Sequence, residues 1–540
     1  MATPSRSIDD AVLPREAPHL ASRASVVAGV LALAIAAGLA IFSGASASLH
    51  RPLWLDEIVT QLVAQAPRGV LHAMRSGVDF QPPPHYVLVW LSDTLAGAGG
   101  AFSARLPSII AASLTVLLLG ATLRTRLSLA SALAGALALA AHPLFVGQAI
   151  EARPYALWIL AAALTAECLR AERRGAAWFA AAAAMALCTS HYFGVLTLAA
   201  MALAGMGYLR FANRMSWNAT IRSLAPLAAG VVALVALLPL ARAQLAATTG
   251  RSWVSPATAG DIAFFLQFIW GWRPAMMLIA AGVLMLAARR IPPLAARLPR
   301  PDRLSLDITL VALLATAAVP LLVVLVTLTY KPVLVLRYSV PALLALATLC
   351  ALAVELLPRP LRWVCVLLLV RAGLFSYQSV AAAAHDESRL FAAETGAVRQ
   401  LAARGIPTVS PFRHDAYRAS LPAGRTPAVA WMDLPDSLLE RAARSGSASL
   451  SHNRLLVERD FGRAVRQEFG FPAVISAEEA RTAPAVALLR DAALSAADTL
   501  WFPGRIACPL SPRLVVYSQP ALATPCDVLQ AALQGTLERR

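Results

Sequence analysis

Long apolar runs separated by short Arg-rich loops fill the first two thirds of the chain. Runs long enough to cross a bilayer lie near residues 25–47, 104–123, 127–147, 153–169, 176–190, 193–209, 223–241, 273–288, 305–329, 339–357 and 361–379. Each is close to the roughly 20 residues that a spanning helix needs, so the pattern predicts an all-α polytopic membrane domain of about eleven helices over 25–380. A polar tail, 1–24, precedes it and lacks the features of a cleaved signal peptide.

The pattern changes beyond about residue 381. The last part of the chain, 381–540, is polar, contains Pro and Gly, and alternates in places, as in the run from Arg513 to Tyr517. It predicts a small α/β domain on the outer side of the membrane. Cys508 and Cys526 both lie in this region, and in an oxidising space we expect them to form a disulfide that closes a loop of about 17 residues.

One shorter apolar run, over 86–95, determines the sidedness of everything that follows it. If 84–97 lies along the surface as a juxtamembrane helix, the loops on one side of the membrane hold about fifteen Arg and few acids, the bias expected of cytoplasmic loops. This predicts an integral, multi-pass protein of the plasma (inner) membrane. Its N-terminus is then cytoplasmic and its C-terminus periplasmic or extracellular.

Composition supports a membrane protein and argues against a nucleic-acid partner. The 540 residues are 58% hydrophobic and 14% charged, and the formal net charge is +17. Soluble domains carry about a quarter charged residues. The excess Arg lies in short loops between apolar runs, where the positive-inside rule accounts for it, so we expect no nucleic-acid binding.

Unusual polar residues gather at the outer ends of the predicted helices. Asp56 and Glu57 follow the first apolar run, and others follow in later outer loops: Asp79, Glu151, Arg153, Tyr155, His191, Lys331, Arg337 and Tyr338. Singly, each has an ordinary explanation, since an acid can stabilise a helix start and an Arg can reach toward lipid headgroups. Their shared location indicates a site at the membrane surface.

Three classes of function are compatible with such a site. A transporter or flippase of lipid-linked sugars would carry ionisable groups near the midplane and an internal repeat, and neither is evident. An inactive scaffold would have lost the acid pair, yet both acids are present. An outer-face sugar transferase using a lipid-phosphate donor would need a carboxylate to take the acceptor proton and a cation for the leaving phosphate. A divalent ion (Mg, Mn or Ca) could share that charge.

The motifs resemble C-type membrane glycosyltransferases, specifically the protein mannosyltransferase and aminoarabinose transferase group (glycosyltransferase family 39-like). Four groups of motifs carry the resemblance over about 25–380: Trp54-Leu55-Asp56-Glu57; Pro82-Pro83 with Tyr86 and Arg105-Leu106-Pro107-Ser108; Glu151-Ala152-Arg153-Pro154-Tyr155-Ala156 with Ser190-His191-Tyr192-Phe193-Gly194; and Lys331-Pro332 with Arg337-Tyr338 and Pro341. Gln81 departs from the His that bacterial relatives often have before the Pro pair.

The resemblance implies a GT-C-like fold and an inverting hexosyl- or pentosyltransferase. The donor is then a polyprenyl-phosphate sugar, and the acceptor a lipid, a glycan or a protein. Asp56 is expected to be the catalytic base, with Glu57 as its rival and Glu151 as the second acid. Asp56 and Glu151 are also the candidate metal ligands. Arg337 is expected to contact the donor phosphate, and the rest of the substrate site is assigned to Lys331, Tyr338, Arg153, Tyr155, His191 and Asp79.

Overall fold

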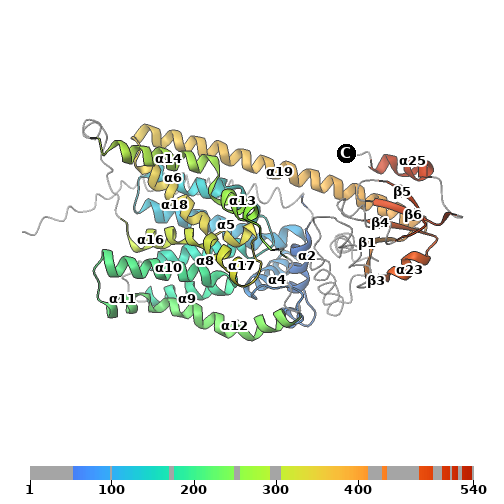
Figure 1. Cartoon of the computed structure of the whole chain (residues 1–540), viewed down its shortest axis with the longest axis horizontal. Helices are drawn as coiled ribbons and strands as arrows, with labels where there is room; N and C mark the ends of the chain where they lie inside the picture. Colours follow the sequence, from blue (N-terminus) through green and yellow to red (C-terminus); the bar gives the residue numbers. More distant parts are fainter. Residues whose placement is uncertain are drawn as a thin grey trace, which may run out of the picture.

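The computed structural model describes residues 51, 53–97, 100–169, 176–247, 254, 256–291, 306–410, 429–433, 474–489, 502–510, 514–520 and 526–537. A large helical body occupies one end of the molecule and a small sheet domain the other (Figure 1). One long helix, α19 (Arg359–Ala403), runs from the first to the second. The predicted N-terminal tail and the first predicted span lie outside the described residues.

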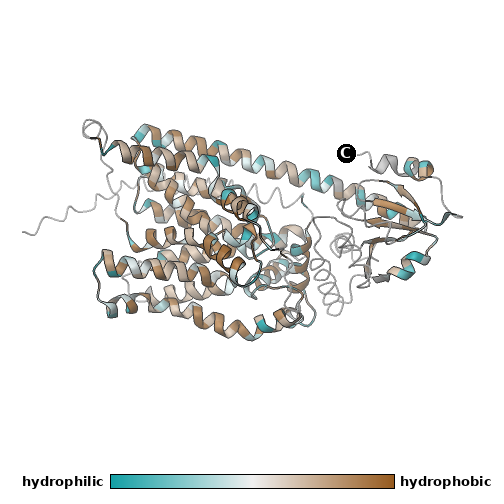
Figure 2. Cartoon of the chain, viewed as in Figure 1, coloured by the Kyte–Doolittle hydropathy of each residue, from teal (hydrophilic) through white to brown (hydrophobic). Residues whose placement is uncertain are grey.

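The helical body contains the apolar segments that the sequence predicts. Its helices are α2 (Leu55–Ala64), α3 (Val70–Arg75), α4 (Pro84–Ala96), α5 (Ala101–Arg124), α6 (Leu129–Ala141), α7 (Pro143–Ala149), α8 (Tyr155–Cys168), α9 (Ala176–Ser190), α10 (Gly194–Gly207), α11 (Trp217–Leu224), α12 (Ala228–Ala247), α13 (Ala259–Trp270), α14 (Arg273–Ala288), α16 (Ile308–Ala315), α17 (Val319–Thr329) and α18 (Ala342–Glu355). Figure 2 shows how apolar these ribbons are.

Close helix packing in this body depends on small residues. Gly135 of α6 faces the α18 backbone so closely that an added Cβ would lie 3.0 Å from the Ala347 carbonyl oxygen. Gly282 of α14 approaches Ala353 of α18 in the same way, with an added Cβ 2.7 Å from its Cα. Small residues of this kind let helices associate where lipid provides no hydrophobic driving force. The core of α5, α6, α8 and α18 is therefore rich in Ala.

The structure supports a multi-pass membrane protein but not a definite number of spans. Each of the ten predicted runs from 104 onward contains a helix. Among the described residues, five helices are long and apolar enough to cross a membrane, or up to seven if two bent pairs each count as one span. Three further apolar helices are shorter. The count of about eleven and the sidedness of the loops stay predictions.

Helix α4 has the features of a surface helix. Its 13 residues extend about 20 Å, short of the roughly 30 Å hydrocarbon core. One side is buried against the protein through Tyr86 and Val89, whereas Trp90, Leu91 and Leu95 on the other side are 44–79% exposed. An exposed apolar stripe of this size needs a cover of lipid. This favours the predicted juxtamembrane position of 84–97 over a transmembrane one.

Helix α19 differs from the prediction in its length. The sequence analysis places a domain boundary near 381, where hydropathy falls, but the helix continues through that point for 45 residues in total. The segment after 380 is rich in Ala, the strongest helix former, whether or not lipid surrounds it. Loss of hydropathy therefore marks where α19 leaves the apolar body, not where it ends.

The C-terminal region contains the predicted sheet. Its strands are β1 (Thr408–Ser410), β2 (Val429–Asp433), β3 (Val474–Ser476), β4 (Ala485–Leu489), β5 (Ile506–Pro509) and β6 (Leu514–Ser518), in the order β3-β2-β1-β4-β6-β5. The pairs among β1 to β4 are parallel, whereas β6 runs antiparallel to both β4 and β5. Helices α23 (Ala477–Thr482) and α25 (Cys526–Leu537) belong to the same region.

The end of α19 forms part of the core of this sheet domain. Ala397, Val398 and Leu401 are at most 1% exposed and join a core to which strands β2, β4, β5 and β6 contribute. Cys508 of β5 and Cys526 of α25 form a disulfide with a Cα–Cα distance of 5.3 Å, the pairing expected from the sequence. The outer location of the domain stays a prediction.

Candidate active site

The two adjacent acids of the first motif have different environments. Glu57, in the first turn of α2, is completely buried and forms a bidentate pair with Arg105 of α5, whose Nε and Nη2 donate at 2.7 and 2.6 Å. Its two oxygens also accept the Ala152 N–H at 2.8 Å and the Trp54 N–H at 3.1 Å. With four donors on two oxygens, Glu57 has little capacity left for a substrate. This geometry favours a structural role over the catalytic one that the sequence left open.

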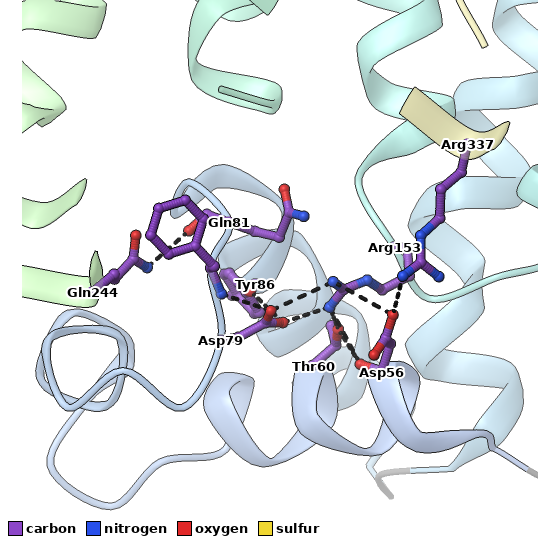
Figure 3. A network of polar contacts seen from close by, with 9 residues as sticks. Asp56, Thr60, Asp79, Gln81, Tyr86, Arg153, Gln244 and Arg337 are labelled. Atoms are coloured by element: carbon purple, nitrogen blue, oxygen red, sulfur yellow. Dashed lines mark hydrogen bonds and ion pairs between the residues drawn. The ribbon is translucent and has the colours of Figure 1, made fainter. Parts of the chain in front are cut away.

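Asp56 points instead toward two guanidinium groups. Its carboxylate is 22% exposed and lies 2.9 Å from Nη2 of Arg337 and 3.8 Å from Nη2 of Arg153. Figure 3 shows Arg337 and Arg153 converging on it from different parts of the chain. Asp56 is therefore the member of the acid pair that faces other predicted site residues.

Arg153 links Asp56 to another acid of the site, Asp79. Its Nη1 donates to Asp79 and, at 3.1 Å, to Thr60 of α2. Asp79 also accepts the Tyr86 hydroxyl and the Phe80 N–H, each at 2.7 Å (Figure 3). Burial alone would raise the pKa of Asp79, but the Arg153 charge and these hydrogen bonds outweigh it and lower the pKa. Asp79 is thus a permanent anion that holds Arg153 in position.

Glu151 is the least satisfied acid of the group. It lies in the turn between α7 and α8, and its Oε2 is buried with no hydrogen-bond partner. Burial, and then the charge of Glu57, raise its pKa to about 7, although Arg51 and Arg337 act in the opposite direction. A carboxyl group with this pKa can gain or lose a proton near neutral pH, as acid–base catalysis requires.

Arg337 lies between aromatic faces. It belongs to a short 3-10 turn, Leu336–Ser339, that follows the loop after α17. Its guanidinium carbon is 5.2 Å from the ring centroid of Trp54 and 5.7 Å from that of Tyr155. These contacts and the ion pair with Asp56 hold the planar guanidinium group in place. A phosphate could take the position of the Asp56 carboxylate beside it. Lys331, earlier in the same loop, is half-buried, which lowers its pKa.

His191 is the centre of an aromatic cluster beside Arg337. Its ring stacks on Trp158 with centroids 4.5 Å apart, and the rings of Tyr155 and Tyr338 lie at 5.5 and 5.4 Å. Nδ1 accepts the Phe193 N–H at 3.1 Å, so the neutral ring carries its proton on Nε2. Burial lowers the pKa of His191 to about 3, and the charges of Arg153 and Arg337 contribute to this, so the ring stays neutral.

Several polar atoms around these residues are buried and have no hydrogen-bond partner. They include Glu151 Oε2, the Tyr155 hydroxyl, His191 Nε2 and Ser339 Oγ. Most buried polar atoms in proteins are paired, so a group of unpaired ones in one region requires an explanation. A polar ligand with several oxygens, such as a sugar phosphate, could satisfy them.

The acids do not form a site for a divalent cation in this arrangement. Among the described residues, no group of three or more His, Cys, Asp and Glu side chains is placed to hold a metal. Asp56, one of the two predicted ligands, is surrounded by guanidinium groups that would repel a cation. The metal stays a prediction of the resemblance, and no step below depends on it.

The structure brings most of the predicted residues together and adds others that sequence reasoning missed. Asp56, Asp79, Arg153 and Arg337 form one network, with Glu151 adjacent and the aromatic residues alongside. Arg105 belongs to one of the motifs of the resemblance, but the sequence analysis assigns it no role. A charged residue inside an apolar run is itself a signal that a partner exists nearby.

Comparison with known proteins agrees with the resemblance. Residues 80–241 match the family model described as dolichyl-phosphate-mannose-protein mannosyltransferase. This segment includes Glu151, Arg153 and His191 and ends before Arg337. No curated protein matches the chain.

Solved structures with a similar fold include ArnT from Cupriavidus metallidurans in the apo state, with a TM-score of 0.56, 16% sequence identity, and coverage of 93% of this chain and 100% of that chain. The same protein bound to undecaprenyl phosphate gives a TM-score of 0.47 at 15% identity, covering 94% and 100%. The Archaeoglobus fulgidus oligosaccharyltransferase complex with Zn and sulfate gives 0.42 at 11%, covering 90% and 73%. The partial match to the family model and the ArnT-like fold agree with the resemblance to C-type membrane glycosyltransferases that the motifs predict.

Proposed function

We propose that this protein is an inverting glycosyltransferase that moves a sugar from a polyprenyl-phosphate donor to an acceptor on the outer face of the membrane. The observation that carries the proposal is the Asp56–Arg337 pair, at 2.9 Å, beside a group of buried polar atoms that have no hydrogen-bond partner. A base and a phosphate-binding cation are the two groups that such a transfer requires.

Donor binding would separate this pair. Arg337 offers a planar fork that suits phosphate oxygens as well as a carboxylate. The donor phosphodiester carries one negative charge, which rises toward two as its bond to the sugar breaks, so the pairing with Arg337 strengthens as the phosphate leaves. When the donor phosphate takes the guanidinium, Asp56 loses its closest counter-ion and becomes free to accept a proton. The uncharged Nε2–H of His191 and O–H of Tyr155 lie beside Arg337. They can donate hydrogen bonds to further oxygens of the sugar phosphate.

The chemical step is a single displacement at the anomeric carbon. The acceptor oxygen forms the new bond to that carbon while the bond to the phosphate oxygen breaks, and the electron pair leaves with the polyprenyl phosphate. The acceptor proton passes to Asp56, and Arg337 neutralises the phosphate. Attack opposite to the leaving group inverts the configuration. Glu151 is the second acid, whose protonation near pH 7 affects the charge next to Asp56.

The test uses the purified full chain in lipid with a polyprenyl-phosphate hexose or pentose. We expect donor-dependent release of polyprenyl phosphate, with inverted configuration of the product by NMR. A general base contributes roughly 10²–10⁴-fold in rate, so Asp56→Asn should lose turnover of that order while donor binding persists. Asp261→Asn is the control, since Asp261 is an exposed acid that caps α13.

A strain lacking the protein should accumulate one polyprenyl-phosphate sugar, which would identify the donor. The flippase alternative predicts a different outcome: movement of a lipid-linked sugar across vesicle membranes without cleavage of its sugar–phosphate bond. Normal turnover of Asp56→Asn would remove Asp56 from the mechanism. Retention of configuration would show that the transfer is not a single displacement.

A further inference from the structure

The long helix α19 reaches the site at its middle, far from either end. Ala384 of α19 and Ile150, which precedes Glu151, are each 2% exposed and pack against each other with Val380. One turn further along, Glu387 pairs with Arg51, whose Nε lies 3.4 Å from its Oε2. The same helix therefore contacts the turn that carries Glu151 at Ile150 and also holds Arg51.

Arg51 also belongs to the framework around Glu151. Its carbonyl oxygen accepts Nη1 of Arg105 at 2.8 Å, and Arg105 in turn holds Glu57, which accepts the N–H of Ala152. Three helices, α19, α5 and α2, and the turn 150–153 are thus joined by one chain of contacts that runs from Glu387 to Ala152. A shift of α19 would be passed to the turn through Ile150 and through Arg51.

We propose that α19 positions the catalytic turn: Ala384 supports Ile150, and Glu387 holds the Arg51 guanidinium at a set distance from Glu151. The proposal rests on the proposed function for the role of Glu151 in turnover. Because the end of α19 lies in the core of the sheet domain, it also connects that domain with the site.

The ion pair has a signature that an idle surface pair lacks. Glu387 holds the Arg51 side chain, and Arg105 holds the Arg51 carbonyl oxygen. Arg51→Gln and Glu387→Gln each remove the same contact, so each should impair turnover, and the double variant should be no worse than either single variant. An exposed ion pair that positions nothing would leave turnover unchanged in all three variants.

The first experiment measures kcat and donor KM in Arg51→Gln, Glu387→Gln and the double variant. We expect kcat to fall roughly threefold to tenfold in each, with little change in KM and with losses that do not add in the double variant. Asp386→Asn is the control, because Asp386 neighbours Glu387 on α19 and is 74% exposed. Unchanged kcat, or losses that add, would overturn the role of the pair.

The second experiment tests the packing contact. Ala384→Leu should displace Ile150 and lower kcat between about tenfold and a hundredfold with little change in donor KM, since small misplacements of catalytic groups are costly. Ala383→Leu, at an exposed neighbouring position, should leave kcat unchanged. Equal kcat values in the two variants would refute the support by α19. Wild-type turnover is measured first, so absence of sugar transfer, which would refute the proposed function, is distinguished from equal kcat values, which would refute only the support by α19.

Discussion

Replacing Glu57 with Gln is predicted to destabilise the fold, whereas replacing its neighbour Asp56 with Asn is predicted to impair only the chemistry. Glu57 and Arg105 are both completely buried, and four N–H groups converge on the two carboxylate oxygens. Gln keeps the shape but replaces one oxygen with an NH₂ group, so two of these donors would face another donor.

The expected cost follows from these contacts. Each lost hydrogen bond to a charged group is worth about 1.5–3 kcal/mol. Breaking a buried ion pair by removing one partner typically costs about 3–5 kcal/mol, because the other charge is left uncompensated. Against a total stability of about 5–15 kcal/mol for a typical protein, that is a large loss. Glu57→Gln should therefore unfold several degrees lower than wild type or fail to accumulate.

Two measurements distinguish the roles of Asp56 and Glu57. They are the melting temperature of each variant in a lipid-containing micelle and its turnover per folded molecule. We expect Asp56→Asn to melt like wild type and to turn over poorly. A double-mutant cycle of Glu57→Ala and Arg105→Ala should give a large coupling energy, since each single change leaves the other residue unpaired. If Glu57→Gln melts like wild type yet has no activity, the catalytic role belongs to Glu57 and the present assignment is wrong.

Three further predictions follow from the site and the sheet domain. Arg337→Lys keeps the charge but loses the planar guanidinium fork and its stacking on aromatic rings, so donor affinity should fall roughly tenfold or more in a binding assay. If Arg337→Ala binds the donor as wild type does, Arg337 only anchors the protein in the membrane. Glu151 has a raised pKa, so the folded chain holds a proton that the unfolded chain releases, and stability falls as pH rises from the usual carboxyl range toward 7. Glu151→Gln should therefore raise the melting temperature at pH 8 but not at pH 4, and an equal effect at both would contradict the raised pKa. Denatured, non-reduced protein should alkylate at four cysteines and denatured, reduced protein at six, since the other four cysteines are free thiols. Reduction should cost the folded protein roughly 3 kcal/mol in the chain-entropy model, and six alkylations without reductant would exclude the Cys508–Cys526 bond.

The sequence predicted those features that depend on local pattern. Apolar runs located the helices, and the Arg bias favoured a surface position for 84–97, which the short, partly exposed helix α4 supports. The shared outer location of Asp56 and Arg337 was enough to expect them in one site, and they form an ion pair. Each of these inferences needs only neighbouring residues and the presence of a bilayer.

Features that depend on tertiary packing were beyond the sequence. Glu57 and Arg105 are 48 residues apart, so nothing local showed that Glu57, and not Asp56, would be neutralised by a buried partner. The continuation of α19 past 381 was missed because hydropathy reports the surroundings of a helix and not its length. Strands as short as β1 and β3, with partners far along the chain, carry too little pattern to be located.

The exposed apolar side of α4 has a consequence for how rates should be measured. Trp90, Leu91 and Leu95 would lie among lipid tails, while Tyr86 on the opposite side holds Asp79 of the site network. Only about one helix diameter, roughly 10 Å, then separates the leaflet from the reacting groups. A lipid-anchored donor would arrive by diffusion in the plane of that leaflet. Turnover should therefore saturate with the mole fraction of donor in the bilayer, and diluting the vesicles in buffer at constant composition should leave it unchanged.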